Sequence, residues 1–279
     1  MDSRAPSIGV LDSGIGGLSV LREIHHLLPQ YPTLYVADQA HLPYGPRPAS
    51  QILDFSLAII RFLLEQGAVM VVLACHAASA AALQAAREQF SGVPFVGIEP
   101  AVKPAALATR SGVIGVLTTQ ATAEGALYRN ALARYGTQVQ VLTRVAPELV
   151  TLAEADTVNL SQARQIVRRQ VEPLLDAGAD HLVLACTHFP FLAPIIQEIA
   201  GPQVRLVDPG PAVARQAARV WPGGPASGPG LHRYFTSGAP AAFEQALERL
   251  LGVRAPAEMV RWRDAVSYTH LTLPTIYSV

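Results

Sequence analysis

The two cysteines of the chain stand in nearly the same sequence context. Cys75 ends the run Val-Val-Leu-Ala-Cys, and Cys186 ends the run Leu-Val-Leu-Ala-Cys. Short runs of Val and Leu predict buried strands, and the residues after each cysteine predict a helix. Because a helix N-terminus favours a thiolate over a thiol, both cysteines are expected to have a lowered pKa and to act as bases near neutral pH.

Two such thiols indicate proton transfer on both faces of one carbon. A single cysteine near a histidine would indicate a nucleophile. Two cysteines on related strands instead allow one thiolate to remove an α-proton while the other thiol returns a proton from the opposite side, which is racemisation. Asp12 and His188 could relay protons, and backbone N–H groups at helix N-termini could stabilise the carboxylate and the developing charge.

The segments around the cysteines predict strands that alternate with helices. Expected strands at 33–37, 69–74 and 93–98 alternate with expected helices at 18–28, 49–66 and 77–90. This alternation predicts parallel βαβ units, whose ligands bind at the carboxyl ends of the strands.

Acidic side chains also stand at these expected strand ends. Asp12 and Ser13 suit the N-terminus of the first helix. Asp38 and Glu99 are expected either to cap helices and bind backbone or to take part in the site.

Three sequence landmarks recur in the second half of the chain, in the same order. Ile-Gly-Val-Leu precedes both Asp12 and Thr118, Leu-Ala precedes both cysteines, and an acidic residue followed by proline occurs at Glu99 and Asp208. This order predicts an internal duplication. The expected fold class is α/β, with two pseudosymmetric lobes, each a parallel sheet flanked by helices, and the active site in the cleft between them.

The expected division gives residues 1–98, completed by 209–265, to the first lobe and residues 99–208 to the second. The segment 211–251 is expected to be rich in helix and to fold back onto the first lobe. The tail 266–279 resembles a translated sequencing-library adapter, so it is expected to be foreign and poorly packed.

Composition favours a globular protein. Half of the 279 residues are hydrophobic and the formal net charge is zero, which gives no electrostatic reason to expect nucleic acid or an anionic membrane as a partner. The apolar runs are shorter than the roughly 20 residues that cross a bilayer, and residues 1–7 lack the apolar core of a signal peptide. A cytoplasmic protein without membrane contact is expected.

Five short motifs together resemble those of the glutamate racemases, in the aspartate/glutamate racemase superfamily. The resemblance runs from about residue 8 to about residue 252. The motifs are Asp12-Ser13-Gly14-x-Gly16-Gly17, Pro43-Tyr44-Gly45, Ala-Cys75-x-x-Ala-Ser79, Glu99-Pro100 and Cys186-Thr187-His188-x-Pro190.

The resemblance implies a cofactor-independent, two-base interconversion of L- and D-glutamate that supplies D-glutamate to peptidoglycan. It implies Cys75 and Cys186 as the bases, assisted by Asp12, His188 and Glu154. Members of the superfamily often form homodimers, although no interface is readable in this sequence. The residues implied to hold the amino acid are Asp12, Ser13, Tyr44, Gly45, His76, Ala77, Thr187 and His188.

The pair after the first cysteine departs from the family pattern. The family usually has Asn-Thr there, and this chain has His76-Ala77. Ala77 cannot replace a hydroxyl, and a lost hydrogen bond to a charged group costs about 1.5–3 kcal/mol. His76 can donate a hydrogen bond, but its ring is bulkier and ordinarily titrates near neutrality. Weak activity, altered substrate choice or a shifted pH optimum are the resulting hypotheses.

Other chemistries have weaker support. Zinc could use Cys75-His76 and Cys186-x-His188, but adjacent residues rarely bind one ion and zinc sites space their ligands differently. Pyridoxal phosphate would need Lys103, the only lysine, which has no supporting pattern. The loop 14–17 lacks the lysine and the spacing of nucleotide-binding loops. Neither a metal nor a cofactor is therefore expected.

Two other functions stay open. One is racemisation of aspartate or another amino acid within the superfamily. The other is a non-catalytic amino-acid-binding protein that kept the fold after the changes at residues 76 and 77.

Overall fold

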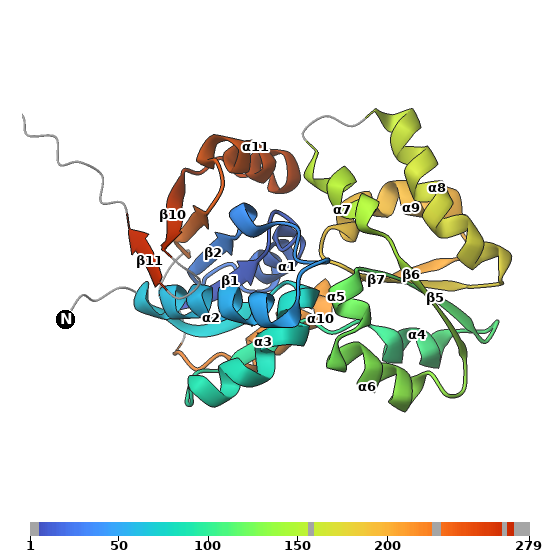
Figure 1. The fold of residues 1–279 in the computed structure, drawn as a ribbon, viewed down its shortest axis with the longest axis horizontal. Coiled ribbons are helices and arrows are strands. Elements are labelled where there is room, and N and C mark those ends of the chain that lie inside the picture. Colours follow the sequence, from blue (N-terminus) through green and yellow to red (C-terminus); the bar gives the residue numbers. More distant parts are fainter. Residues whose placement is uncertain (1–5, 156–158, 225–229, 264–266, 271–279) are drawn as a thin grey trace, which may run out of the picture.

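The computed structural model describes residues 6–155, 159–224, 230–263 and 267–270, which form two mainly parallel sheets flanked by helices (Figure 1). The first sheet has the strand order β11-β10-β9-β2-β1-β3-β4, and only β11 runs antiparallel to its neighbour. Its strands are β1 (Ser7–Asp12), β2 (Thr33–Ala37), β3 (Ala68–Leu73), β4 (Phe95–Gly97), β9 (His232–Thr236), β10 (Ala257–Arg263) and β11 (Ser267–His270).

The second sheet is wholly parallel in the order β6-β5-β7-β8. Its strands are β5 (Val113–Thr118), β6 (Gln140–Val145), β7 (His181–Ala185) and β8 (Arg205–Val207). This order repeats the order β2-β1-β3-β4 of the first sheet, so β5 corresponds to β1 and β7 to β3. The two-sheet α/β fold predicted from the repeated landmarks is confirmed, with each cysteine one or two residues beyond the end of an equivalent strand.

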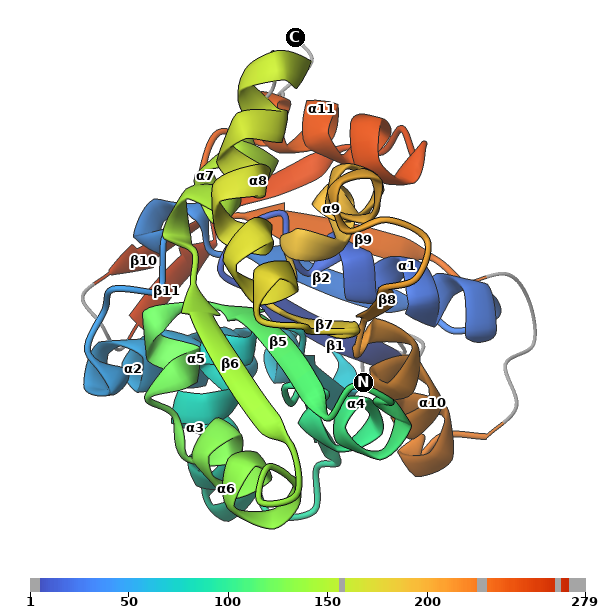
Figure 2. The same cartoon turned by 90° about the vertical axis from the view of Figure 1, so that its right-hand side faces the viewer.

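Helices cover both faces of each sheet, which explains why the central strands are apolar on both faces. Buried clusters on the first sheet involve α1, α10 and α11 on one face and α2 and α3 on the other. On the second sheet, α7, α8 and α9 cover one face, and α4 and α6 cover the other (Figure 2). The bounds are α1 (Leu18–Leu27), α2 (Ala49–Glu65), α3 (His76–Gln89), α4 (Val102–Ala108), α5 (Gln120–Ala123), α6 (Ala126–Tyr135), α7 (Pro147–Glu154), α8 (Leu160–Asp176), α9 (Ala193–Ala200), α10 (Gly210–Val220) and α11 (Pro240–Leu251), with short 3₁₀ helices η1 (Gln39–His41) and η2 (Phe189–Leu192).

The segment 211–251 is rich in helix and packs on the first sheet as predicted, but the C-terminal part also contains two strands that were not expected. The segment 211–251 contains strand β9, which pairs with β2 between helices α10 and α11. Residues 267–270 were expected to be poorly packed, but they form β11, which pairs antiparallel with β10. The remainder of that tail, 266 and 271–279, lies outside the described residues. Both strands are short and gain their stability from a neighbouring strand, so their own sequence gives a weak signal.

Helix α1 starts at the residue that the sequence predicts, but Asp12 and Ser13 do not cap it. Helix α1 begins at Leu18 with Gly17 before it, and no side chain caps it. Asp12 is the last residue of β1 and Ser13 is the first residue of the loop that leads to α1, so both side chains are available for other contacts. None of the described helices is long and apolar enough to span a membrane.

Candidate active site

A cavity of about 650 Å³ lies at the carboxyl ends of strands from both sheets, and both cysteines line it. Parallel α/β sheets bind ligands at this edge, because loops and helix N-termini converge there. Both cysteines are free thiols. The lining residues are Ser13, Leu42, Pro43, Tyr44, Gly45, Pro46, Cys75, His76, Ala77, Thr119, Gln120, Thr122, Val145, Pro147, Glu148, Val150, Thr151, Cys186, Thr187 and His188.

The Cys75 thiol is buried in this wall. It immediately precedes α3, and its Sγ lies 3.8 Å from Ser13 Oγ as a hydrogen-bond donor. Burial, and secondarily the charge of Asp12, raise the pKa of the Cys75 thiol to about 12. The expected lowering of this pKa was wrong, because loss of hydration outweighs the stabilising backbone N–H groups of α3.

The Cys186 thiol has a different set of partners. Its Sγ lies 3.6 Å from His188 Nδ1, and His188 Nε2 lies 2.7 Å from Glu154 Oε1. Burial alone would lower the pKa of His188, but hydrogen bonds to Cys186 and Glu154, together with their charges, raise it well above its ordinary value. His188 is therefore held as a cation between a sulfur and a carboxylate.

No α-helix starts directly after Cys186, although the sequence predicts one there. A turn at Thr187 and His188 leads into the 3₁₀ helix η2, and α9 begins only at Ala193. A 3₁₀ turn of this length provides little helix dipole. The charged group that faces the Cys186 sulfur is therefore His188.

Asp12 lies behind the cavity wall. Its Oδ1 accepts from Gly14 N at 2.8 Å and its Oδ2 accepts from Thr187 Oγ1 at 3.1 Å. Burial raises the pKa of Asp12, while His188 and the backbone N–H groups of the loop oppose this effect. Neither Asp12 nor Glu154 is among the lining residues, so each reaches the cavity through a residue of the Cys186 turn.

The glycines after β1 allow the two halves of the site to touch. A Cβ placed on Gly16 would lie 2.5 Å from His188 Nδ1 and 2.6 Å from Thr187 Oγ1. Ser19 Oγ donates to Thr187 O at 3.0 Å, and Ile15 N donates to Glu154 Oε1 at 3.1 Å. The glycine-rich motif therefore serves close approach of the backbone to the Cys186 turn.

Comparisons with known proteins agree with this geometry. A family model described as Asp/Glu/Hydantoin racemase matches residues 8–217. The chain belongs to this family.

Relatives in this family are similar over nearly their whole length. The glutamate racemase of Ectopseudomonas mendocina (strain ymp) is 46% identical over 264 residues, which cover 91% of this chain and 97% of that protein. The glutamate racemase of Pseudomonas aeruginosa strain PAO1 is 45% identical over 258 residues, covering 90% of this chain and 96% of that protein.

Solved structures show the same fold. A glutamate racemase isoform from Bacillus anthracis gives a TM-score of 0.85 at 32% identity, covering 94% of this chain and 99% of that chain. The Escherichia coli glutamate racemase, in complex with L-glutamate and the activator UDP-MurNAc-ala, gives a TM-score of 0.82 at 33% identity, covering 92% of this chain and 98% of that chain.

His76 and Ala77 both line the cavity, at the first turn of α3. The ring of His76 is buried, and within the described part of the chain neither of its nitrogens has a hydrogen-bond partner. Burial lowers the pKa of His76 to about 3, so the ring is neutral. A buried polar group without a partner is costly, so His76 is an energetically unfavourable residue in this part of the cavity wall.

Several lining residues were missed in the sequence, among them Thr119 and Gln120 beyond β5. In the internal repeat Thr118 aligns with Asp12, so Thr119 aligns with Ser13. The repeat could therefore have predicted that Thr119 lines the cavity. Glu148 and Thr151, on α7, gave no such signal because their contribution depends on how α7 packs.

Proposed function

We propose that this protein is a glutamate racemase that needs no cofactor. The observation that carries the proposal is that two free thiols, each beyond the end of an equivalent strand, line one cavity. Thiols on two walls of one pocket can reach opposite faces of a bound Cα. The similarity to glutamate racemases over more than nine-tenths of the protein supports glutamate as the substrate.

In this mechanism the thiolate of one cysteine takes the proton from Cα. The electron pair of the broken C–H bond stays on the substrate and spreads into the α-carboxylate. The thiol of the other cysteine then gives its proton to the opposite face, so one thiolate and one thiol remain with their roles exchanged. Cys186 lies beside the His188 cation, and Cys75, whose pKa is raised by burial, holds its proton more readily than an ordinary thiol.

Substrate would be held mainly by neutral donors. Among the described residues that line the cavity there is no lysine or arginine. Ser13 and Thr187 provide hydroxyls, and His76 provides a ring N–H once its tautomer is set by the ligand. Tyr44 and Gly45 form part of the same wall, and Ala77 contributes a methyl group. Asp12 would orient Thr187, and Glu154 would orient His188.

The wider role follows from the same relationship. We infer that the product D-glutamate goes to peptidoglycan in the cytoplasm, and that a homodimer is the assembled form. The division into lobes 1–98 with 209–265 and 99–208 fits this mechanism, because each lobe would contribute one thiol.

Incubation with L-glutamate in D₂O tests the proposal. The expected result is D-glutamate that carries deuterium at Cα, at a rate unchanged by prior treatment with a metal chelator. Deuterium exchange and inversion with aspartate or another amino acid, and not with glutamate, would assign a different substrate. Binding of glutamate without exchange would mark the protein as a non-catalytic amino-acid-binding relative.

A further inference from the structure

Asp38 is a buried carboxylate that the mechanism above does not use. It follows β2 directly and is fully buried. Burying a charged carboxylate is costly unless hydrogen bonds satisfy its oxygens. An aspartate kept at such a position therefore needs several donors around it.

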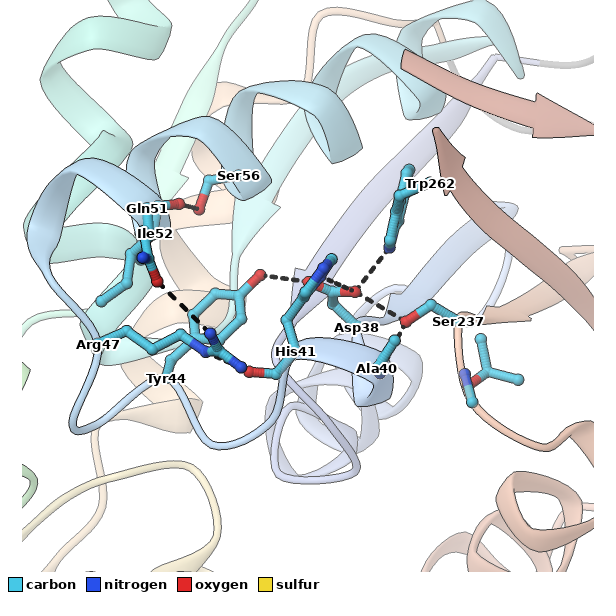
Figure 3. Close-up of polar contacts among 12 residues, drawn as sticks. Asp38, Ala40, His41, Tyr44, Arg47, Gln51, Ile52, Ser56, Ser237 and Trp262 are labelled. Atoms are coloured by element: carbon cyan, nitrogen blue, oxygen red, sulfur yellow. Dashed lines mark hydrogen bonds and ion pairs between the residues drawn. The ribbon is translucent and has the colours of Figure 1, made fainter. Parts of the chain in front are cut away.

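Four side chains supply those donors (Figure 3). His41 Nδ1 lies 2.8 Å from Asp38 Oδ2, and Tyr44 Oη donates to the same oxygen at 2.7 Å. Ser237 Oγ and Trp262 Nε1 each donate to Oδ1 at 2.7 Å. His41 and Tyr44 come from the loop after β2, Ser237 follows β9, and Trp262 is on β10, so one carboxylate joins three separate segments.

Tyr44 connects this group to the cavity. It is buried, lines the cavity and gives its only hydroxyl proton to Asp38. The next residue, Gly45, accepts from Ala121 N at 2.9 Å, so the loop also meets helix α5 beside the second sheet. The cavity wall at Tyr44 and Gly45 is thus held by Asp38 at Tyr44 and contacts helix α5 at Gly45.

We propose that Asp38 is a positioning residue that holds the 43–45 wall of the cavity in place for substrate and ties that wall to strand β10 through Trp262. The inference rests on the proposed function for the identity of the substrate. It assigns a role in substrate binding to a C-terminal strand that lies outside the cavity.

A double-mutant cycle between Asp38 and Tyr44 tests the proposal. Asp38→Asn replaces one acceptor oxygen by an NH₂ group that cannot accept from Tyr44. We expect it to raise KM for glutamate about tenfold and to change kcat by less than about threefold. Because Asp38 acts through Tyr44, the same substitution in a Tyr44→Phe background should raise KM by less than about threefold.

Asp180→Asn is the matched control. Asp180 precedes strand β7. Like Asp38, it accepts hydrogen bonds, from Thr109 Oγ1 at 2.6 Å and from the backbone of Arg110 at 2.7 Å, but it does not line the cavity. It should lower the melting temperature and leave KM unchanged. If Asp38→Asn behaves in the same way, or if its effect multiplies with that of Tyr44→Phe, the proposal is wrong.

Two further measurements keep the test decisive. Trp262→Phe removes the indole N–H while keeping an aromatic ring at this position, and it should raise KM about threefold even if Asp38→Asn does not fold. Wild-type protein that does not racemise glutamate would count against the proposed function alone. In that case a crystal structure of Asp38→Asn still decides the inference, because an unmoved Tyr44 ring would overturn it and a displaced ring would support it.

Discussion

The two thiol sites arise from equivalent strands but have different surroundings. Cys75 faces a hydroxyl, Ser13, and the negative charge of Asp12, and its pKa is raised to about 12 by burial first and by that charge second. Cys186 faces the His188–Glu154 pair. The duplicated scaffold has therefore kept the positions of the two sulfur atoms, while in the described part of the chain a histidine cation lies beside Cys186 alone.

This difference indicates which protonation state is ready for catalysis. A two-base racemase needs one thiolate and one thiol, and the raised pKa of Cys75 favours the proton on that thiol. One of the two directions thus starts with the proton on the favoured thiol, and the other direction starts from the less favoured distribution of that proton.

Replacing either thiol should have the largest effect. Cys75→Ser and Cys186→Ser should each lower kcat/KM for racemisation about a thousandfold, because a hydroxyl is a far weaker base than a thiolate. Each variant keeps one thiol, so in D₂O each should still exchange the α-proton of one enantiomer, and the two variants should differ in which one. A variant that racemises within tenfold of wild type would remove its cysteine from the mechanism.

Weakening the Cys186 side should sharpen the comparison. His188→Asn should lower kcat/KM about 10–100-fold, and Glu154→Gln about tenfold, because each removes charge or orientation beside one sulfur. The loss in kcat/KM must be equal in both directions, since the two enantiomers have equal free energy in solution. The difference between the two thiols should instead appear in the α-deuterium isotope effect on kcat, which should change by different amounts for L- and D-glutamate. An equal change for both enantiomers would contradict this prediction.

The raised pKa of Cys75 predicts the alkaline limb of activity. The ready enzyme needs a proton on Cys75, so kcat/KM should stay flat from pH 8 to pH 10.5 and fall only as the pH approaches about 12. A thiol titrating near its ordinary value would instead cost about tenfold at pH 10. Asp12→Asn removes the charge that contributes to the shift and should move the limb to lower pH. A limb centred at or below pH 9 in wild type would refute this assignment.

The smallest expected effect concerns the first turn of α3. The combined change His76→Asn and Ala77→Thr should raise kcat/KM for glutamate about two- to tenfold, because an amide and a hydroxyl add hydrogen bonds to the bound amino acid. Steady-state kinetics measure the gain. His76→Phe is the control, since it keeps a ring and removes both nitrogens, and it should raise KM. No gain in the first variant would count against a role for these two positions.

Local sequence patterns predicted most of the first sheet. The strand expected at 33–37 has those bounds, and the helices expected at 49–66 and 77–90 occupy Ala49–Glu65 and His76–Gln89. Hydrophobic periodicity succeeds there because each element buries its own apolar face. It failed for β9 and β11, whose place depends on a neighbouring strand edge and which carry little apolar signal of their own.

The alternatives left open for Asp38 were resolved only by the structure. Its donors, Ser237 and Trp262, are separated from it by 199 and 224 positions. No pattern within a window of ten or twenty residues contains that information. The same holds for the buried ring of His76. Its nitrogens lack hydrogen-bond partners among the described residues, and no sequence pattern near His76 indicates this.

The sequence by itself determined the chemistry that is available, because the paired Leu-Ala-Cys runs and the repeated landmarks already require two thiols at equivalent strand ends. Only the tertiary structure decided how those thiols differ. Burial, a neighbouring carboxylate and a histidine cation set their proton affinities, and these come from contacts such as Ile15 with Glu154, 139 positions apart. Strand propensity acts over a few residues, whereas desolvation and charge depend on everything that packs around an atom.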